Sequence, residues 1–168
     1  MATHHTNNQN SYVYLGLAGE TGNGRVVQSG LFRMADGSEE WQRLERGLPE
    51  APAVRALATH PRQPEIIYAG TQSGPYRSAD RGEHWEKVDL PGHGLPVWSF
   101  LFHPHDPDVI FVGCENCEIY RSDDAGERWT RLPVSVRFPE ITTAPGANPA
   151  KRVQIGRASC RERVYVLV

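Results

Sequence analysis

One octapeptide pattern, Ser-x-Asp-x-Gly-x-x-Trp, occurs twice along this chain, and the spacing of its two copies constrains the fold more than any other feature. The copies read Ser78-Ala-Asp-Arg-Gly-Glu-His-Trp85 and Ser122-Asp-Asp-Ala-Gly-Glu-Arg-Trp129, and they lie 44 residues apart. A fixed period of roughly 20 to 50 residues is typical of proteins built from stacked structural repeats. The sequence therefore predicts a repeat architecture.

A third, altered copy lies a further 44 residues upstream. In Met34-Ala-Asp-Gly-Ser-Glu-Glu-Trp41, Asp36 and Trp41 stay in register, while Met34 and Ser38 replace the serine and the glycine. We therefore expect three related units, of which the first has diverged.

Each unit is predicted to contain four short strands. Val54–Pro61 matches Val97–Pro104 and Ile66–Gly70 matches Val109–Gly113, and all four are apolar or alternating runs bounded by Pro, Gly or Asp. The strands are expected near residues 54–60, 65–71, 74–79 and 84–89 of the second unit and near 97–103, 109–114, 118–122 and 128–132 of the third. The first unit begins with Tyr12–Leu17, and its missing opening strand is expected from the distant C-terminus.

The residue types of the octapeptide suit a tight hairpin between the last two strands of a unit. An aspartate carboxylate accepts hydrogen bonds from nearby backbone N–H groups, and a glycine adopts the positive φ that other residues resist. A tryptophan that leaves the turn can bury about 150 to 250 Å² between units. Structural roles are therefore expected for Asp36, Trp41, Ser78, Asp80, Gly82, Trp85, Ser122, Asp124, Gly126 and Trp129.

These units resemble Asp-box, or BNR, repeats, which are found in sialidases, endoglucanase-type glycoside hydrolases, sortilin-like receptors and photosystem II assembly factors. The resemblance implies an all-β fold, a β-propeller fragment of about three four-stranded blades. Their expected bounds are residues 12–46, 47–90 and 91–133, with the start of a fourth blade at 134–154. Because a propeller has roughly four to eight blades, we expect the protein to continue beyond this sequence.

The last residues are expected to be foreign to the fold. Residues 155–164 resemble the translation of a common sequencing adapter and continue no period found upstream. We therefore interpret residues 155–168 as non-native, and Cys160 then carries no chemistry.

Composition limits the partners and the compartment. The formal net charge is -2 and the basic residues are scattered, which argues against nucleic acid. Neither a signal peptide nor an apolar run long enough for a membrane helix is present, so no membrane partner is expected and a cytoplasmic location is the default. Three cysteines do not make a disulfide framework.

No metal site or cofactor is predicted. Cys114 and Cys117 have the spacing of half a zinc site, but no second pair completes four ligands, and a pair closing an ordinary hairpin is favoured. His60 and His103 precede a proline at the same place in two units, which is typical of a structural histidine of the repeat.

Two classes of function remain open. The first is a non-catalytic propeller that binds an unknown protein or a small-molecule or glycan ligand on the rim opposite the Asp boxes. The second is a glycoside hydrolase, sialidase-like or endoglucanase-like, whose carboxylates lie partly in missing sequence. The F-R-I-P run that the sialidase resemblance implies is absent, and the first class is favoured.

Blade geometry predicts where a ligand would bind. The loops between the second and third strands and between blades share the rim opposite the boxes: 19–25, 71–74 and 114–117, and 47–55 and 90–98. On that rim Arg55 and Trp98 occupy equivalent positions at the start of an inner strand, and they offer a guanidinium and an aromatic face. These two residues, with His93 in the loop, are the candidate binding residues, although exposed rim side chains without a partner are common.

Overall fold

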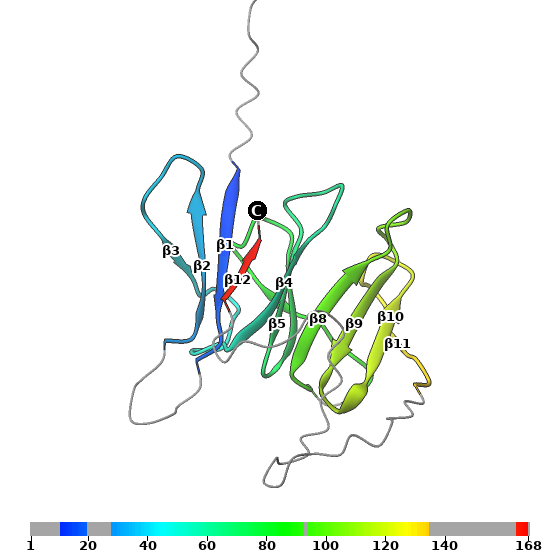
Figure 1. Ribbon diagram of the computed structural model, residues 1–168. Helices are drawn as coiled ribbons and strands as arrows, with labels where there is room; N and C mark the ends of the chain where they lie inside the picture. The colour runs from blue at the N-terminus through cyan, green and yellow to red at the C-terminus, as the bar shows by residue number, and fades with distance from the viewer. Residues whose placement is uncertain (1–10, 20–27, 93, 135–163, 168) are drawn as a thin grey trace, which may run out of the picture.

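The computed structural model describes residues 11–19, 28–92 and 94–134, together with the backbone of residues 164–167. Three antiparallel sheets of four strands make up this part of the chain (Figure 1). The all-β architecture predicted from the repeat is thereby confirmed. We call the sheets blade 1, blade 2 and blade 3.

Each blade has its strands in a simple order. Blade 1 runs β12-β1-β2-β3, at Val164–Leu167, Tyr12–Leu17, Gly30–Ala35 and Gln42–Leu44. Blade 2 runs β4-β5-β6-β7, at Val54–Thr59, Ile67–Thr71, Gly74–Ser78 and Glu86–Lys87. Blade 3 runs β8-β9-β10-β11, at Val97–Phe102, Ile110–Cys114, Ile119–Ser122 and Thr130–Arg131, with a short 3-10 turn η1 at Glu115–Cys117.

The strands of blades 2 and 3 lie where the repeat predicts them. The largest difference is in the outer strands, which are only two residues long, because the preceding tryptophan leaves the sheet to pack between blades. The first position of blade 1 is taken by β12, which pairs antiparallel with β1 through Tyr14 opposite Leu167. Residues 135–163 lie outside the described part, so a fourth blade beginning at 134 and the foreign origin of residues 155–168 stay predictions.

The three blades fan out from their first strands. The backbone of β4 lies beside β12 on one side and β8 on the other, whereas β3 and β11 lie at opposite sides of the molecule (Figure 1). Such a fan buries one apolar layer between each pair of neighbouring blades. The two layers are listed by their most buried members: Tyr14, Leu31, Leu44, Val54, Ile67 and Trp85 between blades 1 and 2, and Tyr68, Val97, Ile110, Val112, Tyr120 and Trp129 between blades 2 and 3.

The box of blade 2 is closed by side chains that bond to its own backbone. The Ser78 hydroxyl donates to Asp80 Oδ1 at 2.8 Å and accepts the N–H of Gly82 at 2.8 Å. Asp80 Oδ1 also accepts the N–H of His84 at 2.9 Å, and the Trp85 indole donates to the Gly82 carbonyl at 3.0 Å. Gly82 has φ +91, which explains the glycine at this position.

The box of blade 3 has the same geometry. Ser122 donates to Asp124 at 2.8 Å and accepts from Gly126 at 2.8 Å, while Asp124 accepts the N–H of Arg128 at 2.8 Å. The Trp129 indole again bonds the glycine carbonyl, at 3.0 Å. Two different sequences thus build one turn, because the residues that make its hydrogen bonds are shared.

The closed box also holds the preceding blade. The Tyr14 hydroxyl of blade 1 donates to the Arg81 carbonyl in the box of blade 2 at 2.9 Å, and the Tyr68 hydroxyl of blade 2 donates to the Ala125 carbonyl in the box of blade 3 at 3.1 Å. Arg81 and Ala125 have φ of 60° and 57°, so each box points the same carbonyl at its neighbour. Burial raises the pKa of Tyr14 to about 12, and the hydroxyl therefore remains a donor.

The altered box of blade 1 does not form this turn. Met34 supplies no hydroxyl, and Ser38 instead accepts the N–H of Glu40 at 3.1 Å. Trp41 is 43% exposed, whereas Trp85 and Trp129 are 3% and 7% exposed. The structural role that the repeat predicts for Trp41 therefore differs from that of the other two tryptophans.

This difference supports a stability test. We expect Trp85→Ala and Trp129→Ala each to reduce the free energy of unfolding by about 3 to 5 kcal/mol, since each removes a large side chain from a closed layer. Trp41→Ala is the matched control and should cost less than about 1 kcal/mol. Chemical denaturation measures all three, and equal losses would contradict the packing described here.

His60 is held by its own turn. Its Nδ1 accepts the N–H groups of Gln63 at 3.0 Å and Arg62 at 3.3 Å, and its ring packs edge-on against Phe102 of blade 3. His103 forms the same turn in blade 3 and accepts from Asp106 at 3.2 Å. Both contacts require an unprotonated Nδ1, and they give this pair of histidines a structural role.

The state of His60 links stability to pH. Burial lowers the pKa of His60 below its ordinary value of 6.5, so the folded protein binds this proton less readily than the unfolded chain. Its contribution to stability is complete above about pH 6.5 and is lost as the pH falls through the lower folded-state pKa. We expect His60→Gln to flatten the fall of unfolding free energy between about pH 7 and pH 5.

The control for this prediction is His105→Gln, because His105 lies in the corresponding turn of blade 3 but is exposed. Urea denaturation across the pH range compares the two variants, and the fall of unfolding free energy should be flatter for His60→Gln than for His105→Gln. An unchanged slope for His60→Gln would show that other groups carry the pH dependence.

Candidate functional site

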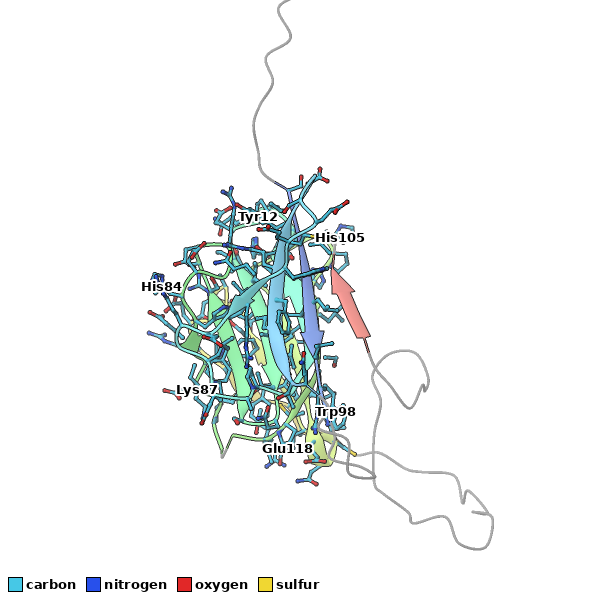
Figure 2. The ribbon with its side chains drawn as sticks, turned by 90° about the vertical axis from the view of Figure 1, so that its left-hand side faces the viewer. Tyr12, His84, Lys87, Trp98, His105 and Glu118 are labelled. Carbon is cyan, nitrogen blue, oxygen red and sulfur yellow. The ribbon has the colours of Figure 1, made fainter. Side chains whose placement is uncertain are left out.

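The Asp boxes lie at one end of the blades, and Trp98 lies at the other. The boxes and the β4–β5 and β8–β9 turns lie at one end, where the Arg81 N–H bonds the Glu65 carbonyl and the Ala125 N–H bonds the Asp108 carbonyl. Trp98 and Glu118 lie together at the opposite end, away from Tyr12 and His105 (Figure 2). We call the end that carries Trp98 the loop rim.

Arg55 and Trp98 both lie in β-bulges at the loop rim. The pairing of β4 with β5 shifts register between Val54 and Ala56, and that of β8 with β9 shifts between Val97 and Ser99. A bulge takes one residue out of the alternation of a strand and redirects its side chain. The same irregularity thus redirects Arg55 in blade 2 and Trp98 in blade 3.

The two redirected side chains meet between the blades. The Arg55 guanidinium carbon lies 4.5 Å from the centre of the Trp98 ring, which is a close cation–π contact. The equivalence of the two positions is a prediction of the repeat, but their contact is not. Stacking on the indole fixes the plane of the guanidinium and leaves its N–H edges available.

The guanidinium of Arg55 can therefore hold an anionic group. Within residues 11–19, 28–92 and 94–134, no carboxylate lies within ion-pair distance of Arg55. Trp98 has a further interaction besides the one with Arg55. A planar, oriented guanidinium suits a carboxylate or phosphate that binds through two oxygens.

A shallow hollow lies beside Trp98 on blade 3. It is lined by Trp98, Ser99, Gly113, Cys114, Cys117, Glu118, Ile119 and Val134. Glu118 is already engaged, because its carboxylate pairs with Arg131 at 2.8 Å and accepts the Tyr120 hydroxyl at 2.5 Å. The hollow therefore offers an apolar surface next to the stacked arginine.

The other loops of this rim bond to themselves or to the chain entering the same blade. The Thr71 hydroxyl donates to the Gly74 carbonyl at 2.9 Å, and the Gln72 side chain accepts the Ala53 N–H at 2.6 Å. These contacts give loop 71–74 a structural role. His93 and residues 20–25, which were also predicted for this rim, lie outside the described residues.

Cys114 and Cys117 are free thiols at the ends of η1. Burial raises the pKa of Cys114 to about 12, so its thiolate is scarce near neutral pH. No group of three or more His, Cys, Asp and Glu in the described part of the chain could hold a metal ion. The pair closes a hairpin and lines the hollow.

Cys114 is buried whereas Cys117 is partly exposed, and this difference predicts selective alkylation. We expect iodoacetamide near pH 8 to modify Cys117 much faster than Cys114. Mass spectrometry of peptides separates the two sites from Cys160. The variant Cys117→Ala should leave Cys114 unmodified, and rapid labelling of Cys114 would contradict its burial.

The carboxylates of Asp80 and Asp124 are hydrogen-bonded within their own boxes. Burial opposes the ionisation of Asp80, but hydrogen bonds from His84 and Ser78 outweigh it and lower the pKa of Asp80 to about 2. The Asp124 carboxylate, at the same place in blade 3, has its pKa lowered by hydrogen bonds from Arg128 and Ser122. A carboxyl group with a lowered pKa is a poor proton donor, so neither residue suits a general acid.

The sequence reading missed part of the hollow. The pattern did not single out Ser99, Glu118 or Val134 as site residues. One signal was present in the spacing of the repeat, because Ile66 and Val109 lie 43 residues apart whereas Ser78 and Ser122 lie 44 residues apart. The loop at 114–118 therefore contains one residue more than its counterpart in blade 2. That insertion accompanies the turn in which Asn116 and Cys117 both have positive φ.

The fanned blades, their box hairpins and their first strands at the centre define an Asp-box β-propeller. The family model described as "Sortilin, neurotensin receptor 3" matches residues 29–157, which is well over half of the chain. The chain belongs to this Sortilin-Vps10 family. No curated protein matches it in sequence. No helix in the described residues is long and apolar enough to cross a membrane.

Several solved structures resemble the fold. The GH74 xyloglucanase from Xanthomonas campestris has a TM-score of 0.56 at 21% identity, covering 75% of this chain and 22% of its own. An ancestral GH74 enzyme has a TM-score of 0.54 at 17% identity, covering 61% and 15%. YCF48 from Cyanidioschyzon merolae has a TM-score of 0.47 at 20% identity, and the match covers 55% of this chain and 27% of YCF48. This chain thus spans less than a quarter of the GH74 enzymes, and the likeness establishes the fold and not the activity.

Proposed function

We propose that this chain is a non-catalytic propeller scaffold that binds a partner on its loop rim, with Arg55 and Trp98 as the anchor. The observation that carries the proposal is the stacking of the two side chains at 4.5 Å across the boundary between blades 2 and 3. Each side chain comes from a different blade, so the anchor exists only when the blades are packed together.

The chemistry of the anchor favours a partner with an acidic group next to an apolar one. A guanidinium stacked on an aromatic ring loses less freedom on binding than a free arginine, because its plane is already set. Beside it, the hollow presents Ile119 and Val134 to an apolar group. A protein segment with an acidic residue next to an apolar residue would satisfy both features.

The interactions of the carboxylates on the two rims favour a binding role over a catalytic one. The carboxylates of the box rim are bonded to their own turns, and Glu118 on the loop rim is bonded to Arg131 and Tyr120. A glycoside hydrolase needs two carboxyl groups that flank the scissile bond. The glycoside hydrolase alternative rests on the GH74 fold likeness alone, and Arg55 covers one face of the indole on which a sugar would stack.

The proposal is tested with a short peptide of alternating Glu and Leu as the probe. We expect Arg55→Ala and Trp98→Ala each to weaken its binding at least about tenfold, or about 1.4 kcal/mol. Arg55→Lys keeps the charge but loses the planar fork, so its affinity should fall between those of the parent protein and of Arg55→Ala. Titration calorimetry gives the affinities, and thermal melting should shift by no more than about 2 °C.

His84→Ala on the box rim is the matched control and should leave the affinity unchanged. A xyloglucan oligosaccharide provides the second arm, because binding or cleavage of the sugar would favour the hydrolase. If the His84 variant lost peptide binding while the Arg55 and Trp98 variants kept it, the binding site would lie on the box rim and the proposal would be wrong.

A further inference from the structure

Thr71 in blade 2 and Cys114 in blade 3 occupy the same position of the repeat. Each ends the second strand of its blade, and each pairs with the valine that begins the first strand. Both side chains are buried, with exposed fractions of 0% and 3%. The contacts of the Thr71 side chain therefore indicate where the Cys114 side chain points.

The Thr71 side chain lies across its own loop. Its hydroxyl donates to the Gly74 carbonyl at 2.9 Å and accepts the Ser73 N–H at 3.0 Å. A side chain at this position is thus directed over the loop residues that follow it. In blade 3 these residues are Glu115, Asn116 and Cys117.

The turn of blade 3 brings its two cysteines close together. The Glu118 N–H donates to the Glu115 carbonyl at 3.5 Å, and the Cys114 N–H donates to the Glu118 carbonyl at 2.8 Å, so the chain reverses within this loop. The end residues of a four-residue tight turn have Cα atoms within about 7 Å, and a disulfide joins Cα atoms about 4.4 to 6.8 Å apart. Cys114 and Cys117 are the ends of such a turn, and both line the hollow beside Trp98.

The two thiols differ in how a reagent reaches them. Cys117 is partly exposed, whereas Cys114 is buried. Burial, together with the nearby Glu118 carboxylate, raises the pKa of Cys114 to about 12. A reagent in solution therefore reacts first at Cys117, and Cys114 then reacts with the group that is bound there.

We propose that Cys114 and Cys117 form a reversible disulfide across this loop by exchange with a small-molecule disulfide such as oxidised glutathione. The Cys117 thiolate attacks one sulfur of the small disulfide, whose S–S bond breaks, and the departing thiolate takes up a proton. The Cys114 thiolate then attacks the Cys117 sulfur of the mixed disulfide, and the second small thiol leaves. Both protein thiols are oxidised while the small disulfide is reduced to its thiols.

The disulfide gives blade 3 a covalent tie where Thr71 makes a hydrogen-bonded tie in blade 2. Because both cysteines line the hollow beside Trp98, joining their sulfurs draws Cys117 toward Cys114 and narrows the apolar surface next to the stacked arginine. The redox state of the pair therefore regulates binding on the loop rim, and this consequence rests on the proposed function.

The disulfide is tested in the complete chain carrying Cys160→Ser, so that Cys114 and Cys117 are the cysteines left to react. After treatment with oxidised glutathione near pH 8, mass spectrometry should show the loss of two hydrogen atoms and a peptide cross-linked between them. Excess reduced glutathione should restore both thiols. A pair that stays reduced, or a glutathione adduct that persists on Cys117, would overturn the proposal.

Cys114→Thr is the matched control for this measurement, because threonine occupies the same position in blade 2. This variant should fold and should keep a stable glutathione adduct on Cys117, since it lacks the thiol that displaces the adduct. Release of glutathione from Cys117 in this variant at the parent rate would contradict the role given to Cys114.

Titration calorimetry with the Glu–Leu peptide tests the regulation. The oxidised protein should bind at least about threefold more weakly than the reduced protein. Cys117→Ser retains only the buried thiol of the pair, and its affinity should be the same before and after oxidation. Equal affinities of the oxidised and reduced parent would show that the disulfide does not regulate binding. A reduced parent that does not bind the peptide would instead contradict the proposed function, and mass spectrometry alone decides whether the disulfide forms.

Discussion

The hydrogen bonds of the serine hydroxyl and the aspartate carboxylate in each intact box hold the rest of this structure in place. The Ser78 hydroxyl and Asp80 carboxylate satisfy the N–H groups of a turn that contains two positive-φ residues. That backbone conformation points the Arg81 carbonyl at the neighbouring blade, where it accepts from Tyr14 and Arg33. A local turn thus becomes the contact that joins two sheets.

The altered box of blade 1 shows what depends on this network. Without the serine, the turn is arranged differently and the tryptophan is 43% exposed. Blade 1 is still held to blade 2, because the box that joins them belongs to blade 2. Divergence of the first box is therefore tolerated within the chain, and its effect is confined to the face that points away from blade 2.

Holding the blades at the box rim leaves the loop rim free to vary. The bulges at Arg55 and Trp98 occur at the same place in blades 2 and 3, but the side chains differ and meet as a stacked pair. Neither residue contributes to a box, so substitution there changes the surface and not the joint. This separation is consistent with a scaffold whose specificity lies on one rim.

The sequence by itself determined the repeat, the strand positions and the turn chemistry, because these depend on hydrogen bonds and alternation between residues close in the chain. It also placed Arg55 and Trp98 on one rim through their equivalent positions. Only the tertiary structure decided that they touch, since residues 43 apart in sequence are brought together by the packing of two blades. The exposure of Trp41 is also a tertiary property, because it depends on which parts of the fold pack against that side chain, and no local pattern encodes them.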